Sequence, residues 1–309
     1  MNKKCIALLI GALMVMTACA APGETPAVDE QTGEESVVEV PATNWEDLRI
    51  VSLSPSQTEN LFALGLGDNL IGVSDYCDYP TEALEKEKMG SSWTINLERI
   101  LEMEPDLVFT FAGGQPEAVQ QMTAMGIQVV DVSPDTVDEV FQSILDTGRL
   151  TGREAKAEEL VAALIQERDD IVARVKDRQR VPVFYQVWDE PLQTAGPGSF
   201  INELIELAGG ENIAADAETA YPMYSVEALV EKNPEIYFMP PHVADFEALT
   251  EEMAESFREE VRNRPGYDQI LAIQNNRIEL LEPNIASRPG IRVIQGLRMF
   301  AEIIHPEVF

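Results

Sequence analysis

Short apolar runs alternate along this chain with longer stretches in which apolar residues return every three or four positions. The short runs predict strands at residues 48–55, 70–74, 106–111 and 127–132, and again at 181–188, 235–240 and 277–283. The longer stretches predict helices at residues 56–64, 96–105, 116–126, 136–150, 199–210, 225–233 and 245–264, and a last helix ending near Ile304. In the first of these helices, Ser56 and Glu59 fit a capping box. Strands that alternate with helices across short turns indicate parallel sheets with helices on both faces.

One stretch interrupts this alternation. Beyond Gly152, residues 151–177 contain no glycine or proline, and their apolar residues fall near helical spacing at Val161, Leu164, Ile165, Ile171, Val172 and Val175. A helix of this length would reach about 40 Å, the width of a domain. We therefore predict two Rossmann-like α/β lobes, residues 48–150 and 179–309, joined by one long rigid helix at 151–178, with a ligand cleft between the lobes.

One phrase occurs in both predicted lobes. INLERILEMEPDL, residues 95–107, is matched 129 positions later by YSVEALVEKNPEI, residues 224–236. In each copy a helix-capping residue is followed two places on by a glutamate, Glu98 or Glu227. A carboxylate in the first turn of a helix interacts favourably with the helix dipole, by about 0.3–1 kcal/mol, and this is reason enough for either glutamate alone. The matching spacing in two lobes indicates, in addition, two carboxylates that could pair with arginines of a symmetrical partner.

The N-terminus has the pattern of an export signal. Residues 1–18 combine two early lysines with an apolar run that is too short to span a bilayer as a mature helix. The ending Met-Thr-Ala-Cys resembles a bacterial lipobox, which predicts cleavage before Cys19 and a lipid on that cysteine; ordinary cleavage that leaves a soluble protein is the alternative. Residues 19–47, acidic and rich in Pro, Gly and Thr, predict a flexible tether. Cys77 then has no partner for an intrachain disulfide.

Charge narrows the choice of partners. The 309 residues include 54 acidic and 22 basic ones, for a net charge of -32, so the chain is not expected to bind nucleic acid. Hydrophobic residues make up 45% of the sequence, enough to build the cores of two lobes. The acidity favours a solvated surface in an extracytoplasmic setting.

Catalytic and metal-binding chemistry have few residues to use. The two histidines, His242 and His305, lie far apart in sequence, and a transition-metal site would need further nitrogen or sulfur ligands. The nucleophile elbow, the Walker loop and the dinucleotide-binding glycine motif do not occur. We therefore predict no catalytic residues, no cofactor and no metal site. A hydrolase that uses two acids stays an alternative, because 54 acidic residues supply many pairs, and an assay of turnover would distinguish it.

Aromatic side chains gather where the predicted strands end. Tyr76, Trp93, Trp188 and Tyr221 all lie at or near strand ends and loops, which is where open α/β sheets bind ligands. Aromatic rings at a cleft offer broad apolar contact with a polar tip. The alternative is that some of these rings pack beneath their own loops.

The whole arrangement resembles the substrate-binding lipoproteins of ABC importers that have a single rigid interlobe helix, a family that handles vitamin B12, haem and ferric siderophores. The resemblance covers nearly all of residues 48–306, and within the family it is closest to the branch that binds vitamin B12. The segments that carry it are RIVSLSPSQTENLFALGLGDNLIGVSDYCDYP, SSWTINLERILEMEPDLVF, LQTAGPGSFINELIELAGGENI, YPMYSVEALVEKNPEI and SRPGIRVIQGL.

The resemblance implies a monomer that is lipid-anchored outside the cytoplasm and holds a corrinoid between its lobes. Residues that would contact the ligand are Tyr76, Trp93, Gly113, Gly114, Trp188, Gln193, Tyr221 and Asn284. The relatives have a phenylalanine where this chain has Gln193 and an aspartate where it has Asn284, so the first contact is more polar here and the second is less charged. The resemblance also implies that Glu98 and Glu227 dock on arginines of an ABC permease dimer, which works with its ATPase.

A ferric siderophore or haem is the alternative ligand. Anionic siderophores favour a cleft lined by arginine. The candidate loops contain few arginines apart from Arg288, so a corrinoid is preferred.

Overall fold

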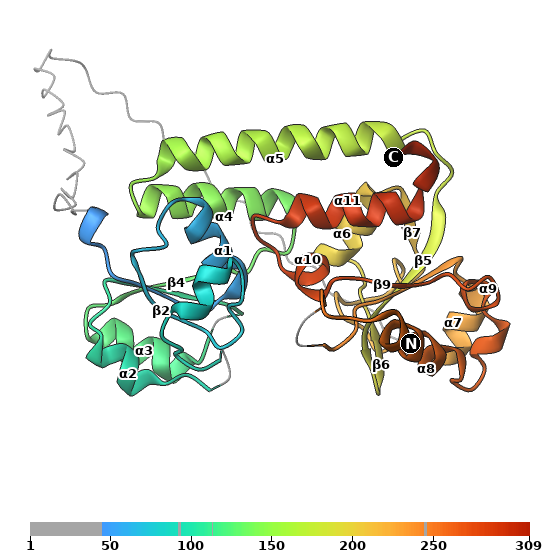
Figure 1. The fold of residues 1–309 in the computed structure, drawn as a ribbon, viewed down its shortest axis with the longest axis horizontal. Coiled ribbons are helices and arrows are strands. Elements are labelled where there is room, and N and C mark those ends of the chain that lie inside the picture. Colours follow the sequence, from blue (N-terminus) through green and yellow to red (C-terminus); the bar gives the residue numbers. More distant parts are fainter. Residues whose placement is uncertain (1–44, 92–93, 113, 244–245) are drawn as a thin grey trace, which may run out of the picture. The chain divides into compact units, whose positions relative to one another are not determined.

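The computed structural model describes residues 45–91, 94–112, 114–243 and 246–309, which form two α/β lobes as predicted (Figure 1). Within that part of the chain, no helix is both long enough and apolar enough to cross a membrane. The lobes are described below in chain order, followed by the long helix between them.

The first lobe is built on a four-stranded parallel sheet in the order β2-β1-β3-β4. Its strands are β1 (Ile50–Ser52), β2 (Leu70–Val73), β3 (Leu107–Thr110) and β4 (Gln128–Asp131). Its helices are α1 (Pro55–Ala63), α2 (Leu97–Glu102), α3 (Pro116–Ala124) and α4 (Val137–Leu150), with 3-10 turns at Trp45–Asp47 and Thr81–Glu85. Residues of β1 and β3 are buried throughout, as expected for strands covered on both faces.

The second lobe repeats this order. Four parallel strands run β7-β5-β8-β9, and β6 adds an antiparallel hairpin to the carboxyl end of β5. The strands are β5 (Val181–Asp189), β6 (Leu192–Thr194), β7 (Gly210–Asn212), β8 (Ile236–Met239) and β9 (Ile278–Leu280). The helices are α6 (Phe200–Leu207), α7 (Val226–Lys232), α8 (Glu251–Arg262), α9 (Leu271–Gln274), α10 (Pro283–Ser287) and α11 (Val293–Ile304), with 3-10 turns at Tyr267–Gln269 and Pro306–Val308.

The long interlobe helix is α5, Glu154–Val175, a single helix of 22 residues and about 33 Å. It begins three residues later than the predicted range 151–177, because Gly152 adopts φ +66° in the turn that separates α4 from α5. Helix α5 packs against α4 of the first lobe and α11 of the second (Figure 1). One apolar core runs from β1 and β3 through α4 and α5 to β5, α6 and α11. The two lobes therefore share a core, which favours a rigid connection.

The predicted capping box at the start of α1 is wrong. Ser54, not Ser56, is the N-cap, and its Oγ accepts a hydrogen bond from the backbone N–H of Gln57 at 3.4 Å. The helix begins at Pro55, a residue suited to the first helical position because it lacks the N–H that would have no partner there. Glu59 is thereby released from the predicted capping role.

Candidate functional site

Three of the predicted ligand residues lie in one row at the carboxyl end of β5. Trp188 is paired across the β5–β6 hairpin with Gln193, and the Gln193 side-chain amide donates to the backbone carbonyl of Tyr221 at 2.9 Å. Trp188 and Tyr221 are both nearly half exposed. These contacts bring two half-exposed aromatic residues and a side-chain amide together at the carboxyl edge of the second sheet, the edge at which open α/β sheets bind ligands.

Tyr221 lies close to the first lobe. Partial burial raises the pKa of Tyr221, and the carboxylate of Asp135 raises that pKa further. Asp135 belongs to the loop that follows β4, at the carboxyl end of the first sheet. Asp135 and Tyr221 come from different lobes, so this influence on the pKa acts between the lobes.

Two further predicted residues, Tyr76 and Asn284, come together across the lobes. The Asn284 side-chain amide donates to Asp78 Oδ2 at 3.2 Å, and Arg288 Nη2 donates to the backbone carbonyl of Tyr76 at 3.0 Å. The Tyr76 ring itself is exposed. The asparagine at position 284 donates a hydrogen bond to Asp78, whereas an aspartate there would set two carboxylates against each other.

These contacts belong to an interlobe ionic cluster made of Glu59, Asp78, Arg288 and Arg292. The Glu59 carboxylate accepts from Arg292 Nε at 2.8 Å, from Arg292 Nη2 at 2.6 Å and from Arg288 Nη1 at 3.0 Å, while Arg288 also pairs with Asp78. The Glu59 side chain is 1% exposed. Sequence reasoning missed this cluster and treated Arg288 as a residue that could favour an anionic ligand. In the structure its charge is neutralised by two carboxylates.

Of the remaining three ligand candidates, only Gly114 belongs to the described residues. Gly114 follows β3 at φ +58°, and a Cβ there would lie 3.2 Å from the Thr110 side chain, so this loop has little room for a larger residue. Trp93 and Gly113 lie outside the described residues, as does the proposed lipid-bearing Cys19.

The two repeated glutamates occupy equivalent places in the lobes. Glu98 is the second residue of α2, which precedes β3, and Glu227 is the second residue of α7, which precedes β8. In chain order, β3 and β8 are the third parallel strands of their sheets. Asn96 and Ser225 cap the two helices through their side chains, as predicted. Both glutamates are exposed, and neither forms an ion pair within the described part of the chain.

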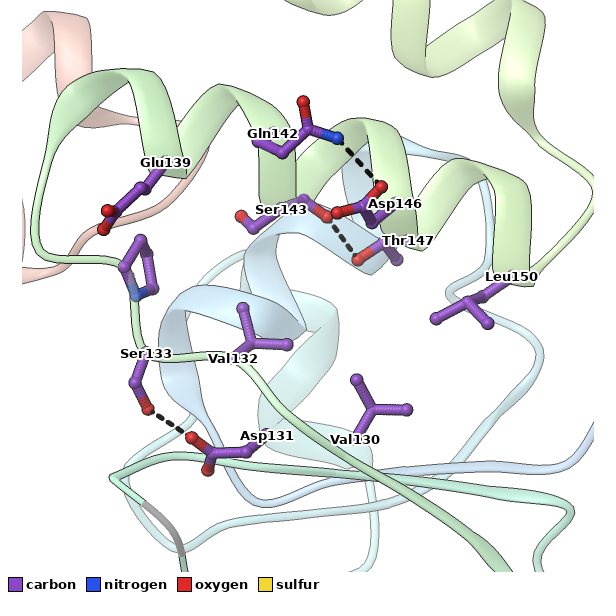
Figure 2. Close-up of a pocket in the computed structure, with 11 residues that line it drawn as sticks. Val130, Asp131, Val132, Ser133, Glu139, Gln142, Ser143, Asp146, Thr147 and Leu150 are labelled. Carbon is purple, nitrogen blue, oxygen red and sulfur yellow. Dashed lines mark hydrogen bonds between the residues drawn. The ribbon is translucent and has the colours of Figure 1, made fainter. Parts of the chain in front are cut away.

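A separate pocket of about 280 Å³ lies in the first lobe between β4 and α4 (Figure 2). Its polar groups are already paired: Asp131 accepts from Ser133 Oγ at 2.8 Å, and Asp146 accepts from Gln142 Nε2 at 2.9 Å. None of the predicted ligand residues lines it, and it is smaller than the pockets that enclose typical organic ligands. We therefore do not assign the ligand to this pocket.

The two histidines lie in different environments. His305 is buried at the end of α11, with Nε2 3.2 Å from the carbonyl of Gly209 and Nδ1 3.6 Å from Glu307. His242 is exposed in the loop after β8, and its ring centroid lies 4.8 Å from that of Trp188. Among the described residues, no group of three His, Cys, Asp or Glu side chains is placed to hold a metal ion.

Comparison with known proteins identifies the family. The model of a family described as periplasmic binding protein matches residues 50–285. The chain belongs to this family. It is the substrate-binding component of an ABC transporter, a transport component and not an enzyme.

Relatives of this binding protein differ in the ligands they are named for. It is 30% identical over 250 residues to the vitamin B12-binding protein of Vibrio cholerae serotype O1, covering 81% of this chain and 86% of that one. It is 32% identical over 273 residues to the substrate-binding lipoprotein YvrC of Bacillus subtilis, covering 85% and 82%. A solved structure from Staphylococcus epidermidis, described as a possible iron-binding (periplasmic solute-binding) protein, superposes with a TM-score of 0.72 at 30% identity over 83% of this chain and 98% of that one.

Proposed function

We propose that this binding protein is lipid-anchored outside the cytoplasm, captures a corrinoid between its lobes and delivers it to an ABC permease. The observation that carries the proposal is the row of Trp188, Gln193 and Tyr221 at the carboxyl edge of the second sheet. A corrinoid has a broad apolar face and a rim of amide groups, which match aromatic rings and a side-chain amide respectively. The 30% identity to a protein named for vitamin B12 supports the same ligand class.

An iron complex is the second candidate, because a structural relative at 30% identity is named for iron. Many ferric siderophores are anionic and need uncompensated positive charge in the site. Arg288, the arginine among the candidate loops, already pairs with Glu59 and Asp78. The charge pattern therefore favours the corrinoid.

The direct test is isothermal titration of the purified chain starting at Ala20, so that the lipid is absent and the folded body is retained. Cyanocobalamin, haemin and a ferric siderophore are titrated in parallel. Saturable one-to-one binding of cyanocobalamin alone is expected. If only an iron complex binds, the ligand assignment is wrong while the family assignment stands.

Replacing Tyr221 by alanine is expected to weaken cyanocobalamin binding. Tyr221 is 46% exposed, and if the ligand covers about 100 Å² of it, the loss is about 2.5 kcal/mol, or roughly sixtyfold in Kd. Met253→Ala on α8 is the matched control, because Met253 is also 46% exposed. Equal affinities of the two variants would remove Tyr221 from the ligand site.

The lipid anchor depends on Cys19. In cells, Cys19→Ser is expected to abolish attachment of the lipid, because serine has no thiol to carry it. Metabolic labelling with a radioactive fatty acid, followed by immunoprecipitation, measures the lipid on each protein. If the variant is labelled as strongly as the unsubstituted protein, Cys19 does not carry the lipid.

A further inference from the structure

The row that carries the proposed ligand site extends by one more residue, His242. Strands β5 and β8 are parallel neighbours, so the loops that follow them leave the second sheet at the same edge. Trp188 lies at the end of β5, and His242 follows β8 after two prolines. Their ring centroids are 4.8 Å apart with an interplanar angle of 53°, so the indole partly covers the imidazole and restricts its orientation.

Only one of the two histidines keeps a free imidazole. His305 has both ring nitrogens near protein oxygens and is 3% exposed. His242 is exposed, and its imidazole makes no hydrogen bond or ion pair among the described residues. A neutral imidazole with an unused lone pair is a common metal ligand in proteins.

We propose that His242 coordinates the metal centre of the cargo, the cobalt of a corrinoid whose exposed axial position holds water. This rests on the proposed function. The step is a ligand exchange: the cobalt–oxygen bond breaks, a cobalt–nitrogen bond to the neutral imidazole forms, and the water leaves. Cobalt keeps its oxidation state and no proton is transferred. A corrinoid that carries cyanide at this position does not exchange it readily, so His242 would select aqua- over cyano-corrinoids.

The test compares two ligands on two proteins. Aquocobalamin and cyanocobalamin are titrated into the chain starting at Ala20 and into its His242→Ala variant, and visible spectra are recorded. The unsubstituted protein is expected to bind aquocobalamin at least tenfold more tightly than cyanocobalamin and to shift the visible bands of aquocobalamin as imidazole ligation does. In His242→Ala the ratio of the two dissociation constants is expected to approach one, and the spectral shift to disappear.

The outcomes separate this inference from the proposed function. If cyanocobalamin binds and aquocobalamin binds with equal affinity and an unchanged spectrum, the inference is overturned and the corrinoid function stands. If neither cobalamin binds, the proposed function fails and the inference fails with it. A spectral shift that persists in His242→Ala would assign the ligation to another residue. His242→Gln, which keeps a polar side chain of similar size beside Trp188, is expected to behave as the alanine variant does, which excludes loss of packing as the cause.

Discussion

Glu59→Ala is expected to lower the free energy of unfolding by about 3–5 kcal/mol, the usual cost of removing one partner from a buried ion pair. The Glu59 carboxylate is almost fully buried and balances Arg288 and Arg292, whose side chains are 14% and 11% exposed. Without it, Arg292 loses its ion-pair partner inside the interface, and Arg288 keeps only Asp78. Urea unfolding followed by circular dichroism and by tryptophan fluorescence measures the change.

The control for this variant is Glu167→Ala. Glu167 pairs with Arg298 between α5 and α11 at an N–O distance of 2.9 Å, within the range of the Glu59 contacts, but the two side chains are 41% and 39% exposed. Solvent screens such a pair, so its loss is expected to cost at most about 1 kcal/mol. Glu59→Gln keeps the size and the hydrogen-bonding capacity of the side chain, and it is expected to fall between the two. If Glu59→Ala costs no more than Glu167→Ala, burial does not govern the strength of this cluster.

The cluster also connects stability to the ligand site. Arg288 holds the carbonyl of Tyr76, and Asp78 holds the amide of Asn284, so residues from both lobes are positioned through the same set of charges. Residual folded protein of the Glu59→Ala variant is therefore expected to bind cyanocobalamin more weakly, although Glu59 lies behind the candidate ligand residues.

Local patterns in the sequence predicted most of the fold. Buried strands such as β3 and β8 are mostly apolar, and helices such as α2 and α7 carry their own capping residues, so these elements are encoded within about ten residues. The repeat of 129 positions was predicted on the same basis, because both copies contain a capped helix followed by a strand. The start of α1 was missed because Ser56-x-x-Glu59 fits the capping pattern, although Ser54 before Pro55 was also visible in the sequence.

The contacts of the site could not be predicted in this way. Glu59 and Arg288 are 229 positions apart, and they meet only because the segment between α10 and α11 lies against α1. Likewise, His242 meets Trp188 only because β5 and β8 are neighbours in the sheet. His242 has no other histidine or cysteine near it in the sequence, so its pattern alone does not indicate a metal ligand. Its place beside Trp188 is visible only in the structure.

Among the described residues, the two glutamates of the repeat form no ion pair, whereas charged residues near them do. Arg99, next to Glu98, pairs with Glu87 and Glu102, and Lys232 on α7 pairs with Asp216 at 2.6 Å. Glu98 and Glu227 remain exposed and without an ion pair among the described residues. Because the two sheets have the same strand order, the glutamates are presented by equivalent helices, which fits the proposal that they dock on a permease made of two related subunits.

Glu98→Ala and Glu227→Ala are each expected to weaken docking on the permease about ten- to hundredfold, since a charge-assisted hydrogen bond to arginine contributes roughly 1.5–3 kcal/mol. The double variant is expected to abolish most uptake of radiolabelled cobalamin, while titration with free ligand gives the same Kd as the unsubstituted protein. Glu117→Ala is the matched control, because Glu117 is also an exposed glutamate in the first turn of a helix, α3, yet has no counterpart in the repeat. Removing the Glu117 carboxylate removes the same kind of helix-dipole interaction but leaves both proposed docking glutamates in place. If Glu117→Ala reduces uptake as much as the repeat variants do, helix stability and not docking explains the two glutamates.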